Sequence, residues 1–304
     1  MSLADDLKRS REYELRTYID SIKAIYENVL AQNGETYDIA RDSTSDFQSI
    51  TATAICADSR IIKILRYATA PSISQMKFGQ FFGLSSIEKF ESDRLEPGTK
   101  KHNELRKIAP QIAKFAIENL DLNRFIWVPE CAKEISDPFL ASEYAKGWTC
   151  SIAADQNSQT RYRNWRKNQQ EHSIASALVK MGYIKSSFSG IVSKHTDIKI
   201  GEFTKELRVQ GRTRQKADLI ARSKKTQKLV LIEAKAVGVE IDSTKRIKEC
   251  CDKANDWKAG VALSNPVVAT VIAGFFNSTG IKSLLASNIA VIWEHRLSDL
   301  GEIL

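Results

Sequence analysis

Three residues in the second half of the sequence have the types and the spacing that phosphodiester chemistry needs. Asp218 is followed, after 14 intervening residues, by Glu233, and Lys235 stands two positions further on. Carboxylate oxygens are the ligands that Mg²⁺ prefers in proteins. An ammonium group beside them can assist a nucleophilic water or stabilise a phosphate whose negative charge is growing. These residues indicate a divalent-cation site, with Asp218 and Glu233 as ligands and Lys235 next to them.

The segment around these residues has the pattern of a β-hairpin. Residues 229–236 form an apolar run of the kind found in buried strands, and a shorter apolar run covers 217–221. The polar residues 223–227 between them predict a turn. Because side chains alternate along a strand, Glu233 and Lys235 share a face with two leucines. Isolated buried charges cost on the order of several kcal/mol unless they are paired or bind a metal, and the adjoining strand can supply a second carboxylate.

A simpler alternative is that these charges have no chemical role. Glu233 and Lys235 would then lie on an edge strand and reach solvent, and Asp218 would end a turn. A Glu-x-Lys tripeptide is common by chance and alone would favour this alternative. The upstream Asp218, the apolar residues of both strands and the basic surroundings favour a cation site instead.

The basic charge of the chain is concentrated around these residues. The net charge is +8, whereas residues 151–250 hold 21 Lys and Arg against 10 Asp and Glu, a net charge of +11. Such a field attracts polyanions and raises association rates. A solvated basic face without a partner is the alternative, and the overlap with the carboxylates and lysine argues against it. We therefore expect DNA phosphates to be bound by three basic segments: Arg161, Arg163, Arg166 and Lys167; Arg212 and Arg214; and Lys245 and Arg246.

Composition argues against several other classes of protein. The sequence has 304 residues, of which 42% are hydrophobic, and no uninterrupted apolar run approaches the roughly 18 residues of a membrane-spanning helix. The first residues lack the layout of a signal peptide, so we expect a cytoplasmic protein without a membrane partner. The five cysteines lack Cys-x-x-Cys spacing. No glycine-rich phosphate loop indicates ATP or nicotinamide binding.

The distribution of apolar residues predicts two regions. Residues 1–150 are expected to be mainly helical and to serve as a DNA clamp, a dimerisation surface or both, with helices at 5–32, 50–68 and 101–120 and a short one ending at 81–82. Residues 151–304 are expected to form the catalytic domain, after a boundary near 150 and a polar break at 155–160. Beyond the hairpin we expect a helix at 243–258, a strand at 260–263, a helix at 267–276 and a strand at 289–293. Alternating elements of this kind predict an α/β (α+β) fold, in which helices flank a mixed sheet.

The spacing of Asp218, Glu233 and Lys235 resembles the PD-(D/E)xK nuclease motif, which reads D-x14-E-x-K in this chain. Ala217 stands where the motif has proline, a position that contributes no chemistry. An ordered set of motifs is similar to the XamI-type restriction endonucleases: Glu171-His172 opening a helix that ends in LVKMGY, then KADLIA, IEAKA, DSTKR at 242–246 and WEHRL at 293–297. The segment 65–74 resembles an early segment of that family, so the resemblance covers most of the chain.

The resemblance implies a type II restriction endonuclease that needs Mg²⁺ and cuts double-stranded DNA at a short palindrome such as GTCGAC, leaving 5′-phosphate ends. In that family the backbone carbonyl between Glu and Lys often joins the metal shell, and here it belongs to Ala234. Glu171 matches an accessory acid, with helix capping as an equal alternative. A homodimer is also implied, as is a cognate DNA methyltransferase as functional partner. Two other functions stay open: a structure-selective nuclease for repair or recombination, and a DNA-binding protein without catalysis.

Overall fold

The computed structural model describes residues 2–128, 137–260 and 263–304, and its contacts divide the chain into two compact units. One unit consists of Met1–Ser21 and Tyr162–Leu304, and the other of Ile22–Arg161. Two long helices, α1 (Leu3–Ser43) and α7 (Pro138–Lys180), contribute residues to both units. The boundary that we expected near residue 150 and the polar break that we expected at 155–160 both fall inside α7. Among the described residues, no helix combines the length and the apolarity that crossing a membrane requires.

The unit Ile22–Arg161 is helical in its described part. Besides the segments of α1 and α7 it contains α2 (Ala52–Ala57), α3 (Ile61–Ala68), α4 (Gln75–Phe81), α5 (Glu88–Glu91) and α6 (Lys100–Glu118). Hydroxyl side chains accept hydrogen bonds from backbone N–H groups of the first turn and so begin three of these helices, at Thr51, Ser74 and Thr99. A core of isoleucine and aromatic side chains holds the helices together.

Two expected helix ends in this region were wrong. The first helix, expected at 5–32, does not end before Asn33-Gly34 but continues to Ser43, because Tyr37 and Ala40 extend its buried stripe. Packing of that stripe outweighs the cost of about 1 kcal/mol that glycine imposes on a helix. The single helix expected at 50–68 is two helices, since Asp58 has extended backbone angles and its carboxylate accepts hydrogen bonds from Arg60.

The other unit contains the predicted mixed sheet, which confirms the expected fold class. Its described strands form a six-stranded sheet in the order β1 (Ile184–Lys185), β3 (Glu202–Lys205), β6 (Leu219–Arg222), β7 (Leu229–Val237), β8 (Val267–Gly274) and β9 (Ala290–Trp293). The β6–β7 pair is the predicted antiparallel hairpin, whereas β7, β8 and β9 run parallel. A three-stranded sheet contains β2 (Ile191–Val192), β4 (Arg208–Gln210) and β5 (Arg214–Lys216).

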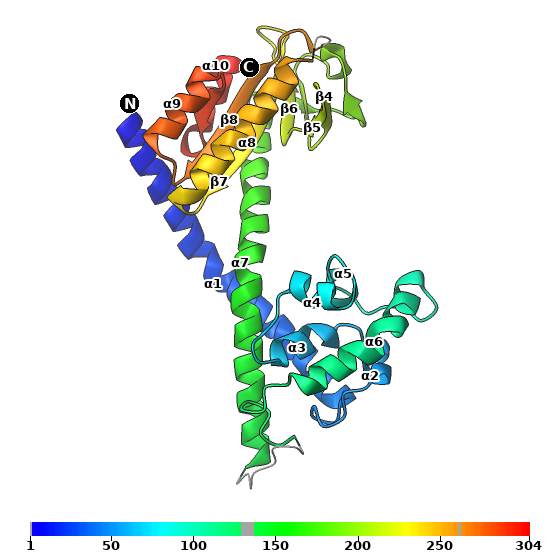
Figure 1. The fold of residues 1–304 in the computed structure, drawn as a ribbon. Helices are drawn as coiled ribbons and strands as arrows, with labels where there is room; N and C mark the ends of the chain where they lie inside the picture. The colour runs from blue at the N-terminus through cyan, green and yellow to red at the C-terminus, as the bar shows by residue number, and fades with distance from the viewer. Residues whose placement is uncertain (1, 129–136, 261–262) are drawn as a thin grey trace. The chain divides into compact units, whose positions relative to one another are not determined.

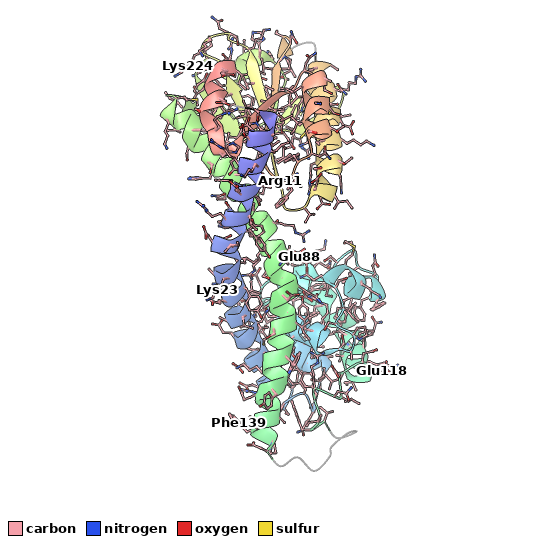
Figure 2. The ribbon with its side chains drawn as sticks, turned by 90° about the vertical axis from the view of Figure 1, so that its left-hand side faces the viewer. Arg11, Lys23, Glu88, Glu118, Phe139 and Lys224 are labelled. Atoms are coloured by element: carbon pink, nitrogen blue, oxygen red, sulfur yellow. The ribbon has the colours of Figure 1, made fainter. Side chains whose placement is uncertain are left out.

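Helices cover both faces of the six-stranded sheet. The helices α8 (Glu240–Lys258) and α9 (Ser278–Ala286) lie side by side over one face (Figure 1), where Leu229 and Leu231 join their core. Val230 and Ile232 join a second core with the end of α7 and with α10 (Leu300–Ile303). The alternation predicted for β7 is therefore present. The first turns of α1 belong to the same unit. Arg11, labelled in Figure 2, donates a hydrogen bond of 3.1 Å to Glu240 on α8.

Two expectations about this unit were also wrong. The helix expected at 267–276 is β8, a strand whose residues are nearly all buried. A short apolar run of this kind does not distinguish a buried strand from a buried helix by its periodicity. The helix that we expected to open at Glu171-His172 begins at Pro138. The strand expected at 260–263 includes residues 261–262, which lie outside the described residues.

Candidate active site

The hairpin brings the two predicted carboxylates to one end of β6. Leu219 pairs with Ile232, so continuing this antiparallel register by one residue places Asp218 opposite Glu233. Residues opposite each other in such a pair share a face, with Cβ atoms roughly 4.5–5.5 Å apart. Asp218 is 6% exposed and Glu233 is 2% exposed. The backbone N–H of Ala234 donates a 2.8 Å hydrogen bond to Asp218 Oδ2, which fixes this carboxylate against β7.

The two oxygens of Glu233 have different surroundings. Lys235 Nζ and Lys253 Nζ each lie 2.7 Å from Oε1 and donate hydrogen bonds to it. The other oxygen, Oε2, is buried and has no hydrogen-bond partner among the residues that the structure describes. A buried carboxylate oxygen without a partner is rare, and an ion that ligates it is one physical explanation. Glu233 therefore has one oxygen held by ammonium groups and one available to a cation.

Lys235 is an ammonium ion at neutral pH. Burial acts to lower its pKa, but the Glu233 carboxylate outweighs this effect, so the pKa of Lys235 is raised above its ordinary value. A second carboxylate, that of Glu249 on α8, lies 3.7 Å from Lys235 Nζ. Lys235 can therefore donate hydrogen bonds to a phosphate oxygen but is not suited to accept a proton.

Helix α7 adds the carboxyl group of Glu171 and the ammonium group of Lys167 to the site. Lys167 Nζ lies 3.4 Å from Glu171 Oε1 and 4.0 Å from Asp218 Oδ1. Glu171 is 5% exposed. Its burial above all, and then the negative charge of Asp218, raise the pKa of Glu171. The predicted accessory acid, Glu171, is thus close enough to Asp218 for the charge of Asp218 to affect its protonation.

Arg166 does not occupy the position that we expected for a DNA contact. It is 2% exposed, and its guanidinium lies 2.7 Å from Glu14 and 2.8 Å from Glu294. These two carboxylates outweigh the effect of burial and raise the pKa of Arg166. The side chain links α7 to α1 and to the end of β9, so we assign Arg166 to the structure of this unit and not to a DNA surface.

The remaining predicted DNA contacts are solvent-exposed residues in several elements. Arg212 and Arg214 belong to the hairpin of β4 and β5, which we call the ribbon (Arg208–Lys216). Lys245 and Arg246 lie on α8, where Arg246 donates a 3.0 Å hydrogen bond to Glu249. Along α7, Arg163 and Lys167 belong to the unit with the sheet, whereas Arg161 belongs to the helical unit and lies 3.4 Å from Asn28.

Our sequence interpretation missed Lys253 and Glu249. Both lie on α8. Glu249 directly precedes the buried Cys250, and Lys253 directly precedes the buried Ala254. Lys253 contacts Glu233 directly, and Glu249 contacts Lys235. The helical pattern of residues 243–258 predicts that one face of the helix packs on the sheet. It does not predict which strand residue each side chain of that face contacts.

The donor set fits a hard divalent cation that keeps part of its hydration. Within the described ranges, no group of three or more His, Cys, Asp and Glu residues is close enough to hold a metal ion alone. Mg²⁺ commonly needs only one or two carboxylates, because waters and substrate phosphates complete its shell. Asp218 and the available Oε2 of Glu233 meet that need.

Comparisons with known proteins concern nearly the whole chain. A model of the XamI restriction endonuclease family matches residues 45–293. The type II restriction enzyme SalI from Streptomyces albus G is 25% identical over 311 positions, which cover 97% of this chain and 95% of SalI. The crystal structure of protein VC1899 from Vibrio cholerae aligns with 92% of this chain at 13% identity and a TM-score of 0.28. This chain spans 55% of the length of VC1899.

Proposed function

Since the chain belongs to the XamI restriction endonuclease family, we propose that it uses Mg²⁺ to cut both strands of DNA at a short palindrome and leaves 5′-phosphate ends. It is a type II site-specific deoxyribonuclease, and restriction enzymes act on double-stranded DNA. The observation that carries the proposed chemistry is that the N–H of Ala234 holds the Asp218 carboxylate against β7, next to Glu233, whose Oε2 is buried without a partner in the described chain. The target is expected to resemble GTCGAC, the sequence that the family resemblance implies.

Asp218 and Glu233 would hold the metal ion, with the backbone carbonyl of Ala234 as a further ligand. When bound, Mg²⁺ supplies Lewis-acid stabilisation of negative charge and lowers the pKa of a coordinated water. The backbone N–H of Ala234 keeps Asp218 in place through its 2.8 Å hydrogen bond. The protein thereby orients the ligands before the metal ion arrives, which lowers the entropy that binding must lose.

The lysines of the site would act on the phosphate. Lys235 remains protonated, so its ammonium group can donate to a non-bridging oxygen as negative charge grows there. Lys167 is exposed next to Asp218 and can reach a neighbouring phosphate. Glu171 holds its proton more readily than an exposed glutamate does, because its pKa is raised by burial and by Asp218. We assign it the role of an accessory acid beside the metal ligands.

Phosphate binding outside the site would use exposed basic residues. Arg163, Lys167, Arg212, Arg214, Lys245 and Arg246 are the residues that we assign to it in the unit with the sheet. Arg161 is the corresponding candidate in the helical unit. Contacts to phosphates position a protein on the duplex without reading its sequence. We infer that they supply most of the salt-dependent binding energy.

The proposed assembly is a homodimer, with the mainly helical residues 1–150 as DNA clamp, dimer surface or both and residues 151–304 as catalytic domain. A palindrome has a two-fold axis, which a C2 dimer matches. A DNA methyltransferase that modifies the same palindrome would be the functional partner. The proposed place of action is the cytoplasm.

Digestion of plasmid DNA by the purified protein tests this function. Discrete fragments that require Mg²⁺ and share one sequence at their ends are the expected result. Nicks that follow DNA structure would favour a repair or recombination nuclease of the same fold, and retardation of DNA without cutting would favour a DNA-binding protein without catalysis. Sequencing of the fragment ends identifies the palindrome, the stagger of the cuts and the position of the phosphate.

A further inference from the structure

One turn of α8 contacts the ribbon at several points. Lys253 Nζ donates a 2.9 Å hydrogen bond to the backbone carbonyl of Lys216. Asp256 Oδ1 accepts hydrogen bonds of 2.7 and 2.8 Å from the backbone N–H and the hydroxyl of Thr213. Trp257 Nε1 donates to the carbonyl of Gln215 at 3.4 Å. The turn 253–257 therefore holds both the tip of the ribbon and the strand β5 that leads from it toward Asp218.

The tip of the ribbon fits closely against this turn. A Cβ atom added to Gly211 would lie 2.3 Å from the backbone oxygen of Asp256, a distance that no side chain can occupy. The N–H of Arg212 donates to the same oxygen at 3.3 Å. Glycine at position 211 is thus what allows the backbone of the ribbon to approach α8. At Gly211 and Arg212 the backbone of the ribbon thus lies directly against the backbone of α8.

Lys253 connects the ribbon to the candidate metal site. The same ammonium group that donates to Lys216 also donates to Glu233 Oε1 at 2.7 Å. Lys216 itself stands two residues before Asp218, so the ribbon leads directly into the other candidate ligand. We propose that Lys253 is a positioning residue that couples the ribbon, and the DNA bound to it, to the metal-binding carboxylate Glu233. This inference rests on the proposed Mg²⁺ site.

The coupling follows from the two acceptors that share one ammonium group. A cation bound to Glu233 repels the charge on Lys253, and the remaining acceptor of Lys253 is the carbonyl of Lys216. The hydrogen bond to the ribbon therefore becomes stronger when the metal ion binds. By reciprocity, a ribbon that is held by DNA draws Lys253 toward Lys216 and makes Glu233 a better ligand for the cation.

Amide hydrogen exchange of the ribbon, with Mg²⁺ as the only added ligand, tests this coupling without DNA and without cleavage. In the wild-type protein, saturating Mg²⁺ is expected to slow exchange in peptides covering residues 208–216 by roughly threefold or more. Lys253→Met is expected to bind Mg²⁺ but to lose the slowing, and Lys253→Arg, which keeps N–H donors, is expected to recover part of it. Lys248→Met removes an exposed lysine of the same helix and serves as the matched control, with wild-type slowing.

Calorimetric titration with Mg²⁺ accompanies each exchange experiment. Equal slowing in the wild-type protein and in Lys253→Met would overturn the coupling, as would Mg²⁺ binding to the wild-type protein without any change in the ribbon. Failure of the wild-type protein to bind Mg²⁺ at all would overturn the proposed metal site and the coupling with it. If Lys253→Met does not fold, Lys253→Gln removes the same positive charge with a polar side chain, and wild-type slowing in that variant would overturn the proposal.

Discussion

At Glu233, one carboxylate oxygen has two ammonium donors and the other has none among the described residues. Around Glu233, the negative charges of the carboxylates and the positive charges of the lysines nearly cancel without a metal ion. Three acids, Asp218, Glu233 and Glu171, lie among the ammonium groups of Lys167, Lys235 and Lys253. Such an arrangement reduces the repulsion between carboxylates that a cation site would otherwise suffer when it is empty. Lys167 and Lys235 can then turn to phosphate oxygens once a cation and DNA are bound.

Replacement of either candidate metal ligand should remove cleavage. We expect Asp218→Ala and Glu233→Ala each to lower the cleavage rate by at least about a thousandfold, which corresponds to about 4 kcal/mol of barrier. The physical reason is loss of a carboxylate that holds the metal ion. Cleavage is measured on plasmid DNA with Mg²⁺, and circular dichroism checks that each variant is folded. Wild-type turnover in either variant would exclude the proposed site.

Lys235 should matter for cleavage but not for holding the metal ion. We expect Lys235→Ala to fail to cut DNA while it still binds Mg²⁺, because its ammonium group assists the phosphate and is not a ligand. Calorimetric titration with Mg²⁺ separates this variant from Glu233→Ala, which is expected to lose the heat of binding. Loss of Mg²⁺ binding in Lys235→Ala would assign Lys235 a structural role instead.

Lys63 on α3 provides a test by pH in the helical unit. Burial first, and then the positive charge of Arg161, lower the pKa of Lys63 from 10.5 to about 8. The unfolded chain therefore binds this proton more tightly than the folded protein does. The resulting loss of stability is complete below pH 8 and disappears as the pH rises toward 10.5, the pKa of the unfolded chain.

We expect Lys63→Met to increase the free energy of unfolding at pH 7 by roughly 1–2 kcal/mol, a value discounted for the partial exposure of the side chain. The gain should shrink steadily between pH 8 and pH 10.5. Urea denaturation of both proteins at several pH values measures it. A gain that does not change with pH would contradict the assignment of the effect to the charge of Lys63.

Among the helices and strands, the pairing of the hairpin could be predicted from the sequence. The rotation of the helices that pack on the hairpin could not. The alternation along β7 and the polar turn before it were enough to predict the hairpin, and the pairing of β6 with β7 confirms it, with Asp218 directly before β6. The place of Lys253 depends on how α8 rotates against β7, which side chains distant in sequence determine. Arg166 was misassigned for the same reason, because its partners Glu14 and Glu294 stand far away along the chain.

The strand β8 shows a second limit of prediction from the sequence. Residues 267–274 are small and β-branched, and nearly all of them are buried. A central parallel strand is covered on both faces, so it lacks the alternation that identifies an amphipathic strand. Its apolar run therefore carries no periodicity that separates it from a buried helix. In the structure, this run is a strand, because it pairs with β7 along eight residues.

The ribbon is the element for which salt dependence is the informative measurement. Replacing Arg212 and Arg214 together with alanine should weaken binding to all DNA sequences and reduce the slope of log affinity against log salt by about two units, since each lost phosphate contact removes roughly one. A double replacement of Lys199 and Lys228, exposed lysines outside the proposed surface, matches the change in charge. Selective loss of discrimination at one base pair, with an unchanged slope, would make the two arginines base readers instead.

For the whole molecule, we infer a dimer from two features. The proposed target is a palindrome, and the described part of each chain holds one candidate site. One site cuts one strand, so two copies related by a two-fold axis are the simplest means of breaking both strands. We expect sedimentation velocity to detect a dimer on a duplex that contains the target, with Ca²⁺ in place of Mg²⁺ to prevent cutting. A monomer on that duplex that still makes concerted double-strand breaks with Mg²⁺ would favour sequential cutting by one reorienting subunit.

We expect Asp218 and Glu233 to hold the catalytic cation together, and anomalous diffraction from crystals soaked in Mn²⁺ locates that cation. Manganese is a hard cation that prefers the same oxygen ligands as Mg²⁺. We expect an anomalous peak within about 2.5 Å of both the Asp218 carboxylate and Glu233 Oε2. A manganese ion bound elsewhere in the chain, with Glu233 Oε2 still lacking a ligand, would contradict it.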